Sequence, residues 1–178
     1  AMQSAHLTAV PTGSNIRVAI VAPDGRDAML QHAAQLAAAK IPFIFDPGQG
    51  LPMFDGPELQ RFIDQATWVA LNDYEARMLC DRTGKPLQEL AALVEAMIIT
   101  LGSEGSRIHT RGQCIEIPCV EADAVVDPTG CGDAYRAGLL HGIARGLPWG
   151  DTGRLASLLG ALKIAHKGTQ NHDFTPTS

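Results

Sequence analysis

Apolar runs and helix-like segments alternate along most of the 178-residue chain, and this alternation restricts the fold more than any other feature. Short runs rich in β-branched and aromatic residues are typical of buried strands, and longer segments with apolar residues three or four apart are typical of helices. The order predicts strands at 16–23, 42–48, 67–72 and 97–102, separated by helices at 24–40, 56–66, 73–82 and 86–96. Such a succession favours a mostly parallel sheet with helices on both faces.

The ends of the chain differ from this pattern. Residues 106–110 and 114–120 flank Arg-Gly-Gln and predict an antiparallel hairpin, and two more helices are expected from about Asp133 and over 152–167. The first fifteen residues are polar and irregular. We therefore expect an irregular N-terminal segment at 1–15 and one α/β domain at 16–178. Asp24 is the expected N-cap of the first helix.

Composition excludes several classes of protein. The net charge of −5 and pI of about 5.6 do not favour a nucleic-acid partner. No apolar run approaches the roughly 20 residues that span a bilayer, and the N-terminus does not have the pattern of a signal peptide. The four cysteines include no CxxC pair, so a zinc site is not expected. These features indicate a cytoplasmic protein.

Polar and glycine-rich segments follow the predicted strands. They are Asp46 to Gly48, Asn72 to Glu75, Gly102 to Gly105, and Asp127 to Asp133. In sheets of this kind, ligands bind at the carboxyl ends of the strands. The four segments are therefore the expected site.

The stretch DPTGCGDAYRAGLL, at 127–140, places glycines directly before a helical apolar face. Gly130, Cys131 and Gly132 would present successive backbone N–H groups at a helix start, where unpaired donors and the helix dipole favour an anion. Asp133 could then accept a proton from a nearby hydroxyl. Alone, the same pattern also fits a glycine-rich turn with Asp133 as a plain N-cap.

Two further motifs each allow two interpretations. Asn72 and Glu75 are three residues apart, so a helix start would place them on one face, where their oxygens suit Mg²⁺ through its waters. They could equally form a capping box. The glycines of TLGSEG, at 100–105, would let a phosphate approach the backbone, or they could only make a turn. Together with the glycine-rich stretch, these motifs are the parts of a phosphoryl-transfer site.

Residues 127–140 closely resemble the C-terminal signature of the ribokinase-like (PfkB) carbohydrate and nucleoside kinases. Asn72 and Glu75 match the NxxE motif of that family, and residues 100–105 match its TLGxxG segment. With DPGQGLP at 46–52, the combination looks most like a bacterial, adenosine-kinase-like branch. The resemblance covers nearly the whole chain. It implies a three-layer α/β/α fold with a mostly parallel sheet, here without the N-terminal strands and β-lid of the family.

The resemblance also implies roles for individual residues. Asp133 would be the catalytic base, and the anion hole would consist of Gly130, Cys131 and Gly132. Asn72 and Glu75 would organise Mg²⁺ through water. The positions that would line the nucleotide are Thr100, Gly102, Gly105, Ser157, Gly160, His166 and Asn171. A monovalent cation, K⁺ in some members, would be held near Asp127 and Thr129.

The expected activity is transfer of phosphate from ATP to a hydroxyl of a sugar or nucleoside, with adenosine among the candidates. The expected cofactors are ATP, Mg²⁺ and K⁺. The partners to test are the acceptor molecule and a second copy of the same chain. The alternative is a catalytically incomplete nucleotide-binding fragment or module. A dehydrogenase-like domain is disfavoured because no GxGxxG follows the first strand. Arg136 is expected to be solvated or ion-paired rather than bound to phosphate.

Overall fold

The computed structural model describes residues 7–11, 17–119 and 131–170, and the side chains of 18–119 and 134–162. Within these residues, seven strands form one sheet in which spatial order follows sequence order. The strands are β1 (Leu7–Pro11), β2 (Arg17–Val21), β3 (Phe43–Phe45), β4 (Trp68–Asn72), β5 (Ala96–Thr100), β6 (Ser106–Thr110) and β7 (Gln113–Ile117).

The centre of the sheet is parallel. Strands β2 to β5 pair in parallel, whereas β1 pairs antiparallel with β2, and β6 and β7 form an antiparallel hairpin next to β5. Strands β2 to β5 and β7 therefore run in one direction, and β1 and β6 in the other. The predicted mostly parallel α/β sheet is confirmed.

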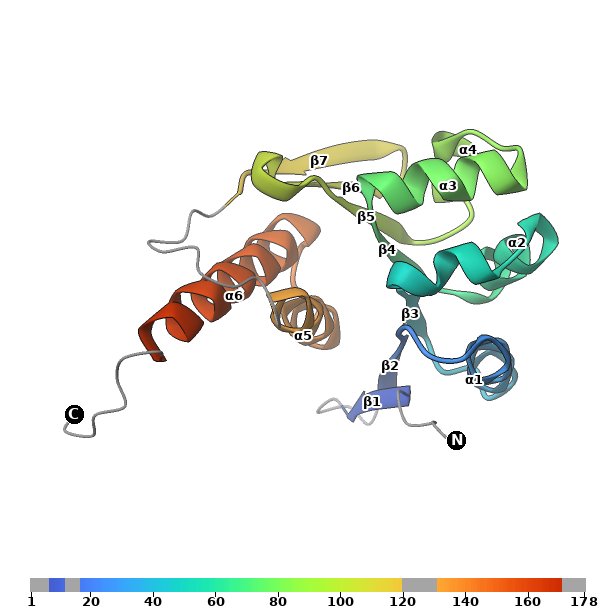
Figure 1. Ribbon diagram of the computed structural model, residues 1–178, viewed down its shortest axis with the longest axis horizontal. Coiled ribbons are helices and arrows are strands. Elements are labelled where there is room, and N and C mark those ends of the chain that lie inside the picture. Colours follow the sequence, from blue (N-terminus) through green and yellow to red (C-terminus); the bar gives the residue numbers. More distant parts are fainter. Residues whose placement is uncertain (1–6, 12–16, 120–130, 171–178) are drawn as a thin grey trace.

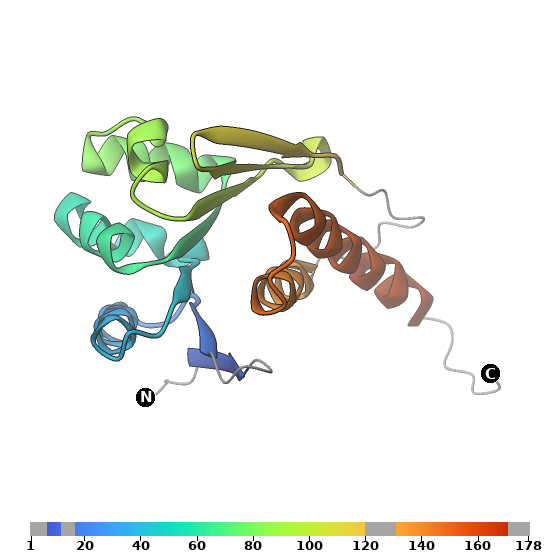
Figure 2. The same ribbon diagram turned by 180° about the vertical axis from the view of Figure 1, so that it is seen from behind.

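Helices cover both faces of the sheet and complete the three layers (Figure 1). One face carries α1 (Arg26–Ala38), α2 (Gly56–Gln65), α3 (Asp73–Thr83) and α4 (Leu87–Ala91), and the other carries α5 (Cys131–Ala144) and α6 (Trp149–Gln170) (Figure 2). Each step from β2 to β5 moves in the same direction across the sheet. Right-handed crossovers therefore bring all the intervening helices to one face, which leaves the other face to the helices that follow β7.

Alternate residues of the strands supply two hydrophobic cores, because successive side chains point to opposite faces. Ala19, Phe43 and Phe45 face α1–α4, while Val18, Ile20 and Ile44 face α5 and α6. On the α1–α4 side, Phe62 stacks on Phe45 with 4.3 Å between ring centroids, and Phe54 meets Phe62 edge-on at 4.9 Å. Four phenylalanines, Phe43, Phe45, Phe54 and Phe62, are fully buried on this side.

Helices α5 and α6 approach each other closely at glycines. A Cβ on Gly138 would lie 2.6 Å from the Cα of Ala156, and one on Gly142 would lie 2.5 Å from the hydroxyl oxygen of Thr152. Any larger residue at these positions would push the helices apart. The two pairs advance by four residues in opposite directions along the two helices, which therefore run antiparallel.

Four local predictions need correction. The N-terminal segment is not entirely irregular, because residues 7–11 form β1, which pairs with β2. Asp24 does not cap α1: the N-cap is Gly25, and the Asp24 carboxylate accepts the adjacent Gly25 N–H at 2.8 Å. The helix predicted at 86–96 ends at Ala91, since the backbone must be extended by Ala96, which pairs with Trp68 in the sheet.

The fourth correction concerns the last two helices, which both begin earlier than predicted. Helix α5 starts at Cys131 rather than near Asp133, and α6 starts at Trp149 rather than at residue 152.

Among the residues that the structure describes, no helix is long and apolar enough to cross a bilayer.

Candidate functional site

Asn72 and Glu75 form a capping box at the junction of β4 and α3. Asn72 Oδ1 accepts the Glu75 N–H at 2.7 Å, and the Asn72 N–H donates to Glu75 Oε1 at 2.9 Å. Asn72 is the last residue of β4 and has an extended backbone, which an N-cap requires. The capping interpretation of this motif is therefore confirmed. A role in holding Mg²⁺ stays a prediction.

Thr100 lies beside Asn72 at the carboxyl edge of the sheet. The two residues are register partners at the ends of β4 and β5, and the Thr100 hydroxyl donates to the Leu71 carbonyl at 3.4 Å. Two of the motifs singled out in the sequence thus meet at one edge. Asp46, directly after β3, belongs to the same edge, because its N–H donates to the Val21 carbonyl and so continues the β2–β3 pairing.

The glycines of the 100–105 turn have different environments. Gly102 is exposed and Gly105 is buried, with backbone φ values of 63° and 92° that favour glycine in both cases. A Cβ on Gly105 would lie 2.0 Å from the carbonyl oxygen of Ile117. Close packing against Ile117 therefore explains a glycine at position 105 without any ligand. Of the two glycines, only Gly102 has open space beside it. Their contact with a nucleotide stays a prediction.

An ion pair joins the carboxyl end of β3 to α5. Arg136 Nε donates to Asp46 Oδ2, and Arg136 Nη2 donates to Asp46 Oδ1 at 3.3 Å. The Asp46 side chain is 8% exposed and that of Arg136 is 27% exposed. Arg136 is therefore ion-paired rather than solvated. The sequence contains no signal that would identify its partner, which lies ninety positions earlier in the chain.

Glu75 lies close enough to this pair to be influenced by its charges. Burial raises the pKa of the Glu75 carboxyl above its ordinary value, and the Asp46 carboxylate raises it further. The bond from the Asn72 N–H and the positive charge of Arg136 lower the same pKa, but they do not cancel the increase. Asp46, Glu75 and Arg136 therefore form one electrostatic cluster at the carboxyl edge.

The start of α5 carries the other predicted residues. Cys131, Gly132 and Asp133 form its first turn, while Asp127, Thr129 and Gly130 lie outside the described residues, as do the side chains of Cys131 and Asp133. Their assignments as base, anion hole and cation site stay predictions. The helical backbone is described from Cys131 onward, and Arg136 connects the second turn of α5 to Asp46.

Two of the predicted nucleotide-lining residues belong to α6, where Ser157 is half-buried and Gly160 is buried. Gly142 packs on Thr152 and Gly138 on Ala156. The same four-residue step places Gly160 opposite the first turn of α5. His166 lies further along α6 with a side chain outside the described set, and Asn171 lies outside the described residues.

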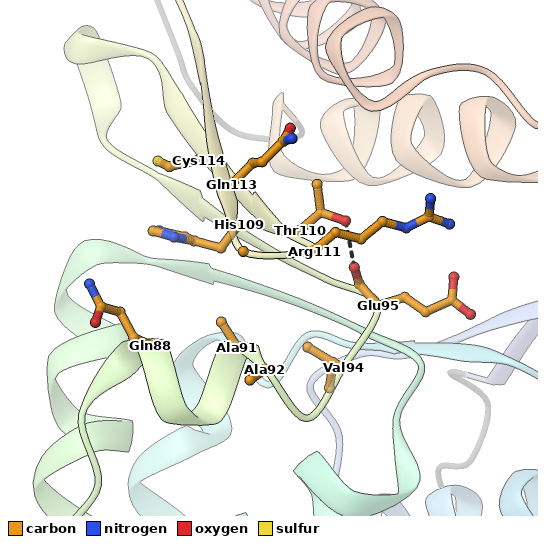
Figure 3. A pocket seen from close by; sticks show the side chains of 11 residues that line it. Gln88, Ala91, Ala92, Val94, Glu95, His109, Thr110, Arg111, Gln113 and Cys114 are labelled. Carbon is orange, nitrogen blue, oxygen red and sulfur yellow. Dashed lines mark hydrogen bonds between the residues drawn. The ribbon is translucent and has the colours of Figure 1, made fainter.

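A cavity of about 650 Å³ lies at the opposite edge of the sheet, between α4 and the β6–β7 turn (Figure 3). At its wall, the Thr110 hydroxyl donates at 2.7 Å to the carbonyl of Glu95, directly before β5. Its polar side chains do not converge, since Arg111 and Glu95 point away from His109 and Cys114 in Figure 3. This cavity is distinct from the edge where the predicted motifs meet.

Comparison with known proteins identifies the family. The sequence profile described as pfkB family carbohydrate kinase matches residues 2–177. The chain belongs to this family. A nucleoside kinase of Methanocaldococcus jannaschii is 34% identical over 128 residues, which are 72% of this chain and 42% of that protein.

Solved structures of two kinases share the fold. The nucleoside kinase of Burkholderia thailandensis in complex with inosine is 57% identical, with a TM-score of 0.82 over 87% of this chain and 51% of that one. The aminoimidazole riboside kinase of Salmonella enterica, solved with aminoimidazole riboside and an ATP analogue, is 26% identical with a TM-score of 0.60 over 78% of this chain and 51% of that one. The chain spans about half the length of the relatives that it matches.

Proposed function

We propose that this protein contributes the nucleotide-binding part of a kinase that transfers the γ-phosphate of ATP to a hydroxyl of a nucleoside. The observation that carries the proposal is the meeting of Asn72, Thr100 and Asp46 at the carboxyl edge of one sheet, with α5 joined to that edge by Arg136. Ligands of parallel α/β sheets bind at this edge.

A nucleoside acceptor is favoured over a simple sugar by the relatives. The Methanocaldococcus protein is a nucleoside kinase, and the Burkholderia nucleoside kinase was solved with inosine and with ADP-inosine. We therefore rank purine nucleosides first, with inosine ahead of adenosine. Because ATP is the donor, we assign the reaction to the cytoplasm.

In this proposal the first turn of α5 carries out the chemistry. Asp133 removes the proton from the acceptor hydroxyl, which then attacks the γ-phosphorus of ATP while the bond to the β–γ bridging oxygen breaks. The backbone amides of Gly130, Cys131 and Gly132 stabilise the negative charge that develops on the phosphoryl oxygens. Thr100, Gly102 and Gly105 line the phosphates, and Ser157, Gly160, His166 and Asn171 border the adenine.

The donors at the carboxyl edge fit a water-mediated magnesium site better than a direct one. Among the described residues, no group of three or more His, Cys, Asp or Glu side chains could hold a metal. Glu75 accepts the capping bond with Oε1, and its Oε2 is not part of the capping box. Mg²⁺ typically keeps several waters and few protein ligands, and it would neutralise charge on the phosphates. The proposed K⁺ ligands are Asp127 and Thr129.

A second candidate is a nucleotide-binding module without transferase activity of its own. The chain spans about half the length of its relatives, and this favours a division of labour in which acceptor-binding groups lie elsewhere. Phosphate transfer by the 178-residue chain alone, assayed with inosine, adenosine and ribose, would exclude this candidate. Binding of MgATP without transfer would support it.

The decisive variant is Asp133→Asn, measured in the form of the protein that transfers phosphate. Loss of a general base typically costs about 10²–10⁴-fold in turnover. We expect a loss of that size in kcat, with affinity for MgATP within about threefold because the amides that would bind phosphate are unchanged. Asp151→Asn, an exposed carboxylate in the first turn of α6, is the matched control. Unchanged turnover of Asp133→Asn would refute the assigned role.

A further inference from the structure

The Asp46–Arg136 ion pair connects two layers of the molecule at the proposed site. Asp46 follows β3 in the sheet, and Arg136 belongs to α5 on the α5–α6 face. The pair has two hydrogen bonds, one from Nε and one from Nη2, so both carboxylate oxygens are engaged. A two-bonded arginine fixes direction as well as distance, which a lysine cannot do.

The carboxylate end of this pair is held firmly by the sheet. Asp46 is buried, and its N–H donates to the Val21 carbonyl at 2.9 Å. Gly48, two residues later, turns the chain with a φ of 52°, and a Cβ there would lie 3.8 Å from Arg136 Nη2 and 2.7 Å from a ring carbon of Pro23. The chain at Gly48 therefore passes close to one end of the guanidinium.

The arginine end of the pair lies on α5, close to the first turn of that helix. Arg136 is three residues after Asp133, so the two positions lie on the same side of the helix. Further along, α5 is held against α6 at Gly138 and Gly142. Close packing thus fixes the middle and end of the helix, and the ion pair attaches its second turn, directly after the turn that contains Asp133.

We propose that Arg136 is a positioning residue, which, through its ion pair with Asp46, holds the first turn of α5 at the carboxyl edge of the sheet. The proposal rests on the function proposed above for that turn. Arg136 acts on the reaction only through the placement of Asp133 and the neighbouring amides. A misplacement of about 1 Å at a reacting group can reduce turnover by about 100-fold.

The first test is amide hydrogen exchange on the 178-residue chain, which requires no activity. The amides of residues 135–138 bond to the carbonyls of the first turn and report its opening. Asp46→Asn and Arg136→Lys should each make these amides exchange about tenfold faster, since each weakens a charge-assisted bond. The control, Arg154→Met, removes an exposed pair with Asp151 and should leave them unchanged. Unchanged exchange in both test variants overturns the proposal.

The second test separates positioning from direct phosphate binding in the form of the protein that transfers phosphate. For Asp46→Asn and Arg136→Lys we expect kcat to fall by about 10–100-fold and KM for ATP to stay within about threefold. The double variant should have a kcat no lower than that of the less active single variant, because both substitutions break the same ion pair. A rise in KM confined to Arg136→Lys would mean contact with phosphate and would overturn the proposal.

The two tests also distinguish the failure of this inference from failure of the proposed function. If the wild type transfers no phosphate in any form while exchange responds as expected, the proposed function fails and the positioning of the turn stands. If exchange does not respond, the positioning role fails whatever the activity. A variant that does not fold is recognised by loss of protection throughout the sheet, and the isosteric Asp46→Asn then decides alone.

Discussion

The two helical layers are packed in different ways. On the α1–α4 face, large side chains such as Phe45, Phe54 and Phe62 fill the space between helices and strands. On the other face, α5 and α6 meet almost backbone to backbone at Gly138 and Gly142. The first layer depends mainly on buried volume, and the second combines its own hydrophobic core with close helix approach and, among the described residues, the Asp46–Arg136 ion pair. The helix that carries the predicted catalytic residues is thus held by close helix–helix contact and an ion pair in addition to its buried side chains.

Phe62→Ala should give the largest loss of stability. It removes a ring that is in contact with two other buried rings, and a substitution of this kind typically costs about 3–5 kcal/mol. Urea unfolding would measure the loss. Phe62→Leu is the control and should lose clearly less, because it keeps most of the apolar volume. Equal losses for Leu and Ala would show that this face needs the aromatic geometry as well as the volume.

Gly138→Ala should have the next largest effect on stability. We expect it to destabilise the protein, whereas the same substitution in an exposed helix normally stabilises. Replacing glycine by alanine within a helix normally stabilises by about 0.5–1 kcal/mol. Here the added Cβ would lie 2.6 Å from the Cα of Ala156, and overpacking of this kind typically costs about 1–3 kcal/mol.

Gly150→Ala is the matched control for that measurement. Gly150 lies in the first turn of α6, where the nearest atom to an added Cβ is a side-chain nitrogen of Arg154 at 3.7 Å. This variant should be neutral or slightly more stable. If Gly138→Ala also stabilises, the two faces do not differ in the way described.

Local signals explain which elements were predictable. Asp55 and Asn72 begin helices with the residue types that cap them, and both form capping boxes. The buried strands were recognisable as apolar runs. Strand β1 was missed because Leu7–Pro11 has a weak pattern of its own and gains its strand structure from pairing with β2. Helix α4 was predicted five residues too long at its C-terminal end because the register of β5 overrides helix propensity before Ala96.

The residues of the candidate site also divide into those that local motifs predict and those that depend on tertiary structure. Asn72, Thr100 and the start of α5 were predicted from motifs, and the carboxyl-end rule correctly brought the first two to one edge. The partner of Arg136 depends on tertiary structure, and no local pattern encodes it. Gly138 and Gly142 did carry a readable signal, since small residues four apart on a helix are typical of close helix packing.

Asn72→Ala tests whether the capping box at the carboxyl edge has a second role. It should cost about 1 kcal/mol of stability, the usual value for a lost N-cap. Asp55→Ala removes the equivalent capping box of α2 and should cost about the same. In a titration with MgATP, only Asn72→Ala should raise the Kd, by about tenfold, or about 1.4 kcal/mol. Equal affinity in both variants would leave Asn72 with the capping role alone.

The smallest effect concerns pH and Glu75. Because the folded-state pKa of Glu75 is raised above its ordinary value by burial first and by Asp46 second, the folded protein holds this proton more tightly than the unfolded chain. The stability that Glu75 contributes is therefore fully present below its unfolded pKa and decreases as pH rises through the folded pKa.

Glu75→Gln cannot ionise and keeps an oxygen for the capping bond. Urea unfolding between pH 4 and pH 7 should accordingly show the stability of wild type falling relative to that of Glu75→Gln as the pH rises. Arg136→Met removes the positive charge that lowers the Glu75 pKa, so in that variant the decline should extend to higher pH. Parallel curves for wild type, Glu75→Gln and Arg136→Met would mean that the charges of the cluster do not act on Glu75.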